Sequence, residues 1–119
     1  MREIKFRAWD TDNNLFVICE DHQIRQINND YAGLGNRYIY QQYTGQKDIA
    51  ENEVYDGDVI KNCDTDLLQV VYWHEGASAW YCRYVEDEKR IVSLADSLGN
   101  LNFVIGNIYE TPELLTHDR

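Results

Sequence analysis

The 119-residue sequence predicts a mainly β fold with little helix. Aromatic and β-branched residues recur in short runs, and Asn, Asp and Gly cluster between these runs. Most of the runs alternate apolar and polar side chains, which places the apolar ones on a single face of a strand. A chain of this length can bury one hydrophobic core, so we expect a single domain over residues 1–119.

The first part of the chain predicts a β-hairpin followed by a loop. Residues 4–9 alternate, residues 10–14 are rich in turn formers, and residues 15–19 form a second apolar run. Residues 20–36 hold two helically spaced isoleucines that Asn and Gly clusters interrupt, so they predict only a loop or a short helical turn.

Three features follow in the middle of the chain. Residues 37–43 alternate and predict a strand, which the Thr-Gly pair after them ends. Asp56 and Gly57 stand between apolar pairs and predict a tight turn, because glycine adopts positive φ without strain. Residues 67–74 are apolar on both faces, which suits a strand buried on both sides or one that rolls over a small barrel.

The last part predicts three more strands and a short helix. The strands span residues 78–85, 91–95 and 102–107, and the helix lies within residues 109–115. Thr111 stands at the capping position of this helix and Pro112 at its first position. Alternation within the first of these strands predicts three inward-facing side chains, those of Trp80, Cys82 and Tyr84.

Three stretches together resemble the YopX-like proteins, which are small proteins of phages and prophages. They are MREIKFRAWD at 1–10, QQYTGQKDIAENEVYDGDVI at 41–60 and VIGNIYETPELL at 104–115. The resemblance implies an SH3-like small barrel over residues 37–119, preceded by the hairpin and loop of residues 1–36. It supplies no catalytic residue and no established function. The chain departs from the family pattern at residues 49–53, which lack the usual Gly-containing turn.

The chain carries 21 acidic and 11 basic residues, which gives a formal net charge of −10. Residues 1–60 hold 11 acids and 6 bases, and residues 61–119 hold 10 and 5, so each half contributes −5. This balance disfavours direct binding to nucleic-acid phosphates or to an anionic membrane.

The sequence also predicts a cytoplasmic protein. No apolar run approaches the ~18 residues of a membrane span, and the N-terminus has charges where a signal peptide is apolar. The three cysteines are odd in number and widely spaced, which predicts free thiols instead of a disulfide framework.

Residues 10–21 partly match a calcium-binding loop. Asp10, Asp12 and Asn14 occupy its first three ligand positions. Leu15 stands at the sixth position instead of Gly, and Asp21 at the twelfth instead of Glu. We therefore interpret this segment as a hairpin turn in which Asx side chains bind the backbone.

Thiols and imidazoles offer two further kinds of site. A tetrahedral zinc site could use Cys19, His22, Cys63, His74 and Cys82, but the paired Cys-x-x-Cys spacing is missing. A nucleophilic cysteine, Cys63 or Cys82, could use His74 as its base, yet no known catalytic signature surrounds either one. We therefore predict no enzyme, no metal and no cofactor.

The fifteen aromatic residues exceed what turns require, since the chain has nine Tyr, three Trp and three Phe. Tyr43, Trp73 and Tyr81 are our candidates for an exposed surface that contacts proteins. The alternative is that they are ordinary partly exposed residues of a β surface.

The residues and the resemblance together predict a phage- or prophage-encoded accessory protein that acts by protein–protein contact. We expect its partners to be a second copy of itself, through strand edges and aromatics, or a host or phage protein. The alternative is an acidic nucleic-acid mimic that occupies a host DNA-binding protein, which the even charge division does not support. A nucleic-acid-binding barrel would rest on fold analogy alone.

Overall fold

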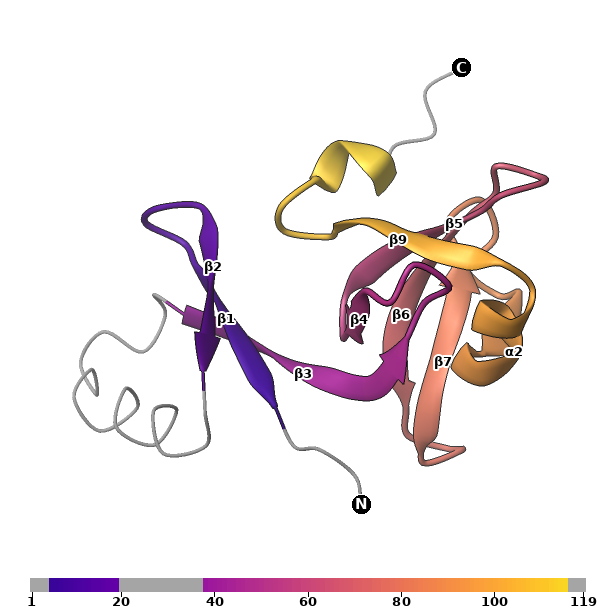
Figure 1. Cartoon of the computed structure of the whole chain (residues 1–119), viewed down its shortest axis with the longest axis horizontal. Helices are drawn as coiled ribbons and strands as arrows, with labels where there is room; N and C mark the ends of the chain where they lie inside the picture. Colours follow the sequence, from indigo (N-terminus) through magenta and orange to yellow (C-terminus); the bar gives the residue numbers. More distant parts are fainter. Residues whose placement is uncertain (1–4, 20–37, 116–119) are drawn as a thin grey trace.

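The structure is a computed structural model that describes residues 5–19 and 38–115. It is mainly β, with one short α-helix in this part of the chain, and its curled sheets form a half-barrel consistent with a small all-β barrel (Figure 1). The predicted fold class is therefore confirmed. The predicted loop or helical turn at residues 20–36 lies outside the described residues.

A four-stranded antiparallel sheet holds the N-terminal hairpin. Its strands, in spatial order, are β2 (Leu15–Cys19), β1 (Phe6–Asp10), β3 (Tyr38–Lys47) and β4 (Glu53–Tyr55). The predicted hairpin is confirmed, since β1 and β2 pair over their full length. The strand β3 also pairs with β1, so it lies in the same sheet as the hairpin.

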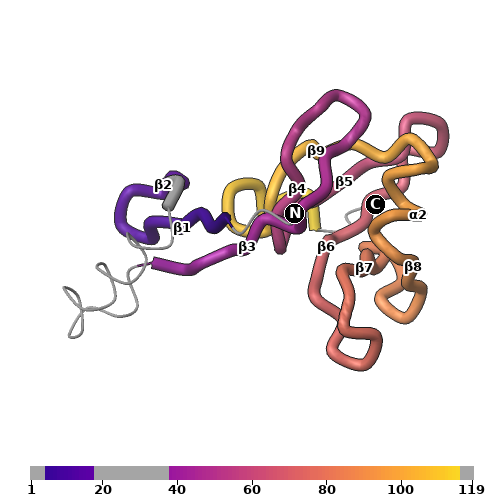
Figure 2. The backbone as a smooth tube through the Cα atoms, turned by 60° about the horizontal axis from the view of Figure 1, so that its bottom comes forward, coloured from indigo at the N-terminus to yellow at the C-terminus, as the bar shows by residue number. Residues whose placement is uncertain are grey.

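A five-stranded antiparallel sheet forms the rest of the molecule. Its strands, in spatial order, are β8 (Ile91–Ser93), β7 (Ala79–Tyr84), β6 (Leu68–His74), β5 (Asp58–Asn62) and β9 (Asn102–Asn107). Figure 2 shows the hairpin β1–β2 at one end of the molecule and this sheet at the other, with β3 leading from one to the other.

The tight turn predicted at Asp56 and Gly57 is confirmed, and Gly57 has a φ of +85°. It is a corner between the two sheets, because β4 pairs with β3 while β5 pairs with β6 and β9. Backbone hydrogen bonds hold it from both sides. Asp56 N donates to Gln42 O at 2.9 Å, Gly57 N to Val71 O at 2.9 Å, and Ile108 N to Gly57 O at 3.0 Å.

The hydrophobic core lies on the concave side of the five-stranded sheet, under the helix α2 (Leu94–Gly99). The fully buried members of the core are Val54, Ile60, Val71, Cys82 and Leu94. Trp80, Val92, Leu98 and Val104 pack against them. The predicted inward orientation of Trp80 and Cys82 is therefore confirmed.

Two predicted strand ends are wrong. The strand β3 continues through the Thr-Gly pair to Lys47, because Gly45 at φ +88° accommodates a register shift between Tyr43 and Lys47. The strand predicted at residues 91–95 ends at Ser93, whose Oγ accepts a hydrogen bond from Asp96 N at 3.2 Å. This N-cap starts α2, a helix that the sequence did not predict.

The C-terminal helix is confirmed as a short 3₁₀ helix, η2 (Pro112–Leu115), with Pro112 at its first position. The predicted cap is wrong, because Thr111 Oγ1 accepts a hydrogen bond from Asn107 N at 2.9 Å and so faces back toward β9. No helix in residues 5–19 and 38–115 is long and apolar enough to cross a membrane.

Candidate functional site

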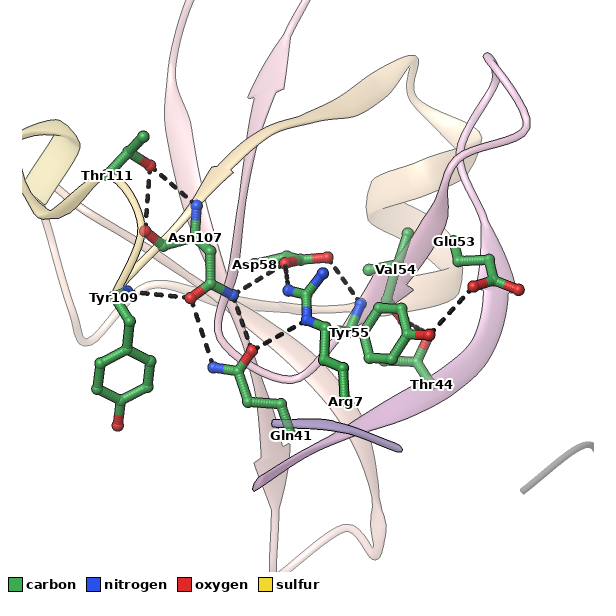
Figure 3. Close-up of polar contacts among 10 residues, drawn as sticks. All are labelled: Arg7, Gln41, Thr44, Glu53, Val54, Tyr55, Asp58, Asn107, Tyr109 and Thr111. Carbon is green, nitrogen blue, oxygen red and sulfur yellow. Dashed lines mark hydrogen bonds and ion pairs between the residues drawn. The ribbon is translucent and has the colours of Figure 1, made fainter. Parts of the chain in front are cut away.

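A buried carboxylate stands where the two sheets meet, at the start of β5 (Figure 3). Asp58 is 1% exposed and forms an ion pair with Arg7 of β1. Its carboxylate also accepts hydrogen bonds from Tyr55 N at 2.7 Å and Asn107 Nδ2 at 3.0 Å. Burial raises the pKa of Asp58, because desolvation outweighs the opposing effects of Arg7 and of these donors.

Two buried amides extend this contact to β3 and to the C-terminal segment. Gln41 Oε1 accepts hydrogen bonds from Arg7 Nε at 3.2 Å and from Asn107 Nδ2 at 3.1 Å. Asn107 Oδ1 accepts one from Tyr109 N at 3.0 Å. We call Arg7, Gln41, Asp58 and Asn107 the junction network. It joins β1, β3, β5 and β9, and its polar groups are matched within the protein.

Aromatic rings enclose the charged end of Arg7. The guanidinium carbon lies 4.0 Å from the ring centroid of Phe16 and 4.2 Å from that of Tyr55. Both rings are close enough for cation–π attraction. Arg7 is thus held by the carboxylate of Asp58 and by two rings, which leaves it fixed in place instead of reaching into solvent.

A second buried carboxylate, that of Asp48, links the β3–β4 turn to β9. Asp48 follows β3 and is 4% exposed. Its Oδ1 accepts hydrogen bonds from Ala50 N and Asn52 N, and its Oδ2 accepts one from Val104 N of β9, all at 2.9 Å. Burial alone would raise the pKa of Asp48, but the hydrogen bonds from Val104, Asn52 and Ala50 hold it below its ordinary value.

An open cleft of about 520 Å³ lies between β4 and β9. It is lined by Arg7, Glu51, Asn52, Glu53, Tyr55, Asp58, Val104, Ile105, Gly106 and Glu110. Its acidic lining is partly neutralised, since Glu53 forms an ion pair with Lys5 at 2.6 Å and Asp58 with Arg7. The cleft thus lies between the two sheets, and two of its carboxylates, those of Glu53 and Asp58, are paired with basic side chains.

The structure does not bring the three candidate contact residues together. Tyr43 is 4% exposed and packs against Tyr55, with ring centroids 5.5 Å apart, so it is not part of an exposed surface. Trp73 is 38% exposed and lies across from Trp80, whereas Tyr81 is the next residue along β7. Because successive strand residues point to opposite faces, Trp73 and Tyr81 lie on opposite sides of the sheet.

Tyr81 belongs to a different aromatic group, on the convex side of the five-stranded sheet. We call this group the aromatic face: Tyr72 and His74 of β6, Tyr81 and Arg83 of β7, and Ile91 of β8. The His74 ring lies 4.9 Å from that of Tyr81 and 5.9 Å from that of Tyr72. Ile91 is 41% exposed, and the other four side chains are half-buried.

Sequence reasoning found only Tyr81 among these five residues. Alternation along each strand could have found part of the group. It places Tyr72 and His74 on the same face of β6, and Tyr81 and Arg83 on the same face of β7. Tyr72 pairs with Tyr81, which puts both pairs of residues on the same face of the sheet. This pairing depends on the strand register, which the sequence does not show.

The thiol candidates are separated in the structure. Cys82 is fully buried in the core, where burial raises its pKa to about 12, and it lies on the opposite face from His74. Cys63 is exposed at the end of β5. His74 Nδ1 accepts a hydrogen bond from Ala77 N at 3.2 Å, so it holds the β6–β7 turn. The Cys19 side chain and His22 lie outside the described residues.

The calcium-like segment is a turn. Asp10 Oδ1 accepts hydrogen bonds from Asp12 N at 2.9 Å and from Asn13 N at 3.3 Å, which is the expected Asx arrangement. Within the described ranges, no group of three or more His, Cys, Asp or Glu side chains is placed to hold a metal ion.

The fold and the junction network define a small, mainly β protein in which two antiparallel sheets meet around a buried arginine–aspartate pair. The model of the YopX protein family matches residues 5–116, and the chain therefore belongs to this family. The crystal structure of protein EF1440 from Enterococcus faecalis is similar, with a TM-score of 0.64 and 18% sequence identity. The match covers 98% of this chain and 100% of that one. No curated protein matches the chain.

Proposed function

We propose that this YopX family member is a phage- or prophage-encoded accessory protein that acts by protein–protein contact and self-associates through the aromatic face. One observation carries the proposal: five aromatic, cationic and aliphatic side chains, four half-buried and one exposed, share one face of the sheet, and none of the five is acidic. Tyr and Arg are enriched in protein interfaces, and clusters of them mark the residues that contribute most of the binding energy.

Charge favours a second copy at this face over other regions of the surface. Two chains with a net charge of −10 each repel one another, so they associate most easily where acidic residues are missing. The aromatic face supplies Arg83 as its charged residue, and the guanidinium carbon of Arg83 lies 5.8 Å from the Tyr72 ring centroid. A twofold axis through such a face would match rings with rings.

The order already present in the aromatic face lowers the cost of association. The His74 ring contacts the rings of Tyr72 and Tyr81 within a single chain, so binding would restrict few additional rotamers. The strand β8 adjoins the face and is the outermost strand on that side of the described sheet. An exposed strand edge favours pairing with another chain.

Multi-angle light scattering over a dilution series tests the proposal. The chain has a mass of 14.0 kDa, and we expect a larger apparent mass that falls toward this value on dilution. Tyr81→Asp should give 14.0 kDa at every concentration, because it adds a negative charge to each copy of the contact. Tyr109→Asp is the matched control, since Tyr109 is 37% exposed outside the face, and it should behave as the wild type.

A wild-type mass of 14.0 kDa at all concentrations would contradict self-association. The alternative, an acidic nucleic-acid mimic, needs its carboxylates on one side of the molecule. Exposed acids instead occur in separate turns, including Asp12 between β1 and β2 and Asp64 between β5 and β6. Figures 1 and 2 place these two turns at opposite ends of the molecule. Recovery of a host DNA-binding protein with Tyr81→Asp would favour the mimic.

A further inference from the structure

A second cavity, of about 340 Å³, lies between α2 and the concave side of the five-stranded sheet. Its lining comes from the strands β5 to β9, from α2 and from the segments that connect them: Asn62, Asp64, Thr65, Leu67, Gln69, Tyr84, Arg90, Val92, Ser97, Asn100 and Asn102. The volume falls within the ~300–1,000 Å³ of typical small-molecule sites. This cavity lies on the opposite face of the sheet from the aromatic face.

Three buried polar side chains line this cavity. Gln69, Ser97 and Asn102 are 3%, 2% and 2% exposed. Asn102 Nδ2 donates to Ser97 O at 2.5 Å and to Ser97 Oγ at 3.1 Å. A carbonyl oxygen can only accept, so the amide nitrogen of Asn102 must face Ser97.

The same reasoning orients Gln69. Ser97 Oγ accepts from Asn102, and its own hydrogen is donated to Gln69 Oε1 at 2.5 Å. The oxygen of Gln69 therefore faces Ser97, and its Nε2 faces away. These hydrogen bonds thus determine which atom of each side-chain amide has no partner.

The two side-chain amides therefore leave one acceptor, Asn102 Oδ1, and one donor, Gln69 Nε2, without a partner among the described residues. Asn102 Oδ1 is buried, and no hydrogen-bond partner for it exists among the described residues. Gln69 Nε2 likewise forms no hydrogen bond within that part of the chain. Buried polar groups in folded proteins are almost always paired, so an orphaned acceptor beside a cavity indicates a missing partner.

We infer that this cavity binds a small neutral molecule with a planar group that presents both a hydrogen-bond donor and a hydrogen-bond acceptor. The donor would bind Asn102 Oδ1, and the acceptor would bind Gln69 Nε2. Asn and Gln recognise the edges of amides and heterocyclic bases by this pairing. Arg90 and Tyr84 form a stacked wall, with the guanidinium carbon 4.1 Å from the ring centroid, and Leu67 and Val92 supply apolar contacts.

Charge favours a neutral ligand over an anionic one. Arg90 and Asp64 both line the cavity, so their charges oppose each other, and the chain as a whole carries −10. An ionised carboxylate would also place only acceptors against Asn102 Oδ1, which is itself an acceptor.

Titration of the ¹⁵N-labelled chain, followed by NMR, tests the inference with benzamide, adenosine, cytidine and benzoate as probes. We expect saturable shifts of the Gln69 and Asn102 side-chain amides and of the Ser97 backbone with benzamide or a nucleoside. Benzoate should cause none, because it offers acceptors alone. Tighter binding of a nucleoside would assign the site to heterocyclic bases, and binding of benzamide alone would assign it to amides.

Two variants separate recognition from packing. Gln69→Glu keeps an acceptor for Ser97 but removes the free donor, so we expect ~10-fold weaker binding, which corresponds to about 1.4 kcal/mol. Glu75→Gln changes an exposed carboxylate outside the cavity lining and should bind as the wild type does. If Gln69→Glu fails to fold, the comparison of benzamide with benzoate on the wild type still decides.

Three results would overturn the inference. They are the lack of saturable shifts at Gln69, Ser97 and Asn102 with every probe, equal binding of benzoate and benzamide, and an ordered water on Asn102 Oδ1 that no probe displaces.

Discussion

At the scale of single residues, the junction network depends on the carboxylate of Asp58. This group receives hydrogen bonds or an ion pair from β1, from β4 and from β9. A buried ion pair adds little stability over a well-packed apolar pair, but removal of one partner leaves an uncompensated charge. The network therefore fixes how the sheets meet more than it adds to the free energy of unfolding.

Asp58→Ala should lower the free energy of unfolding by about 3–5 kcal/mol, because it leaves Arg7 and the Tyr55 amide without their acceptor. Urea unfolding measures the change. Lys61→Met is the control, since it removes the exposed Lys61–Asp66 pair (3.5 Å) and should cost less than about 1 kcal/mol. Similar losses in both variants would show that the network is not a buried structural contact.

Asp48 makes stability depend on pH in a defined direction. Its folded-state pKa lies below the ordinary value of 3.8, so its contribution is complete above pH 3.8 and is lost as pH falls through the folded-state pKa. Asp48→Asn lacks this contribution. The difference in unfolding free energy between wild type and variant should therefore shrink on acidification below pH 3.8, measured by urea unfolding from pH 7 to pH 3. A constant difference over this range would refute the assignment.

At the scale of the elements, the corner at Gly57 directs the chain from one sheet into the other. A Cβ at this position would lie 2.5 Å from Gln41 Nε2, inside the junction network. Gly45 has a similar φ, but its Cβ would meet nothing within 4 Å. The two glycines therefore separate backbone strain from disturbance of the network.

Gly45→Ala should cost about 1–3 kcal/mol of unfolding free energy from the positive φ alone. Gly57→Ala should cost more, because the same strain is added to the displacement of Gln41. Thermal and urea unfolding of both variants measure the difference. Equal costs would mean that Gln41 moves aside freely and that the corner does not depend on the network.

Local sequence signals predicted the strands well, since alternation and turn residues act over a few positions. They missed α2 because it spans six residues and its stability comes from burial of Leu94 and Ser97. The end of β3 was also misplaced, because Gly45 is typical of both a turn and a bulge.

The candidate sites were harder to predict, for a different reason. Gln41 lies 34 residues from Arg7 and 66 from Asn107, and each looks ordinary in its own segment. Alternation shows which residues share a face, but not which face lies against the core. Tyr43 was therefore expected outside and lies inside, and Trp73 was grouped with Tyr81 although the sheet separates them.

At the scale of the whole molecule, the proposal of self-association rests on the net charge and on the aromatic face. We propose that the net charge of −10 opposes contact between copies elsewhere, whereas none of the five residues of the aromatic face is acidic. Protein EF1440 shares the fold at 18% identity. Whether Trp73 also contacts a protein partner stays a prediction, and so does the identity of any host or phage partner.

The central claim is self-association through the aromatic face, and a dilution series of ¹⁵N NMR spectra tests it most directly. We expect concentration-dependent shifts at the backbone amides of Tyr72, His74, Tyr81, Arg83 and Ile91, and their loss in Tyr81→Asp. Shifts confined to the β1–β2 hairpin, or spectra that do not change with concentration, would contradict the claim.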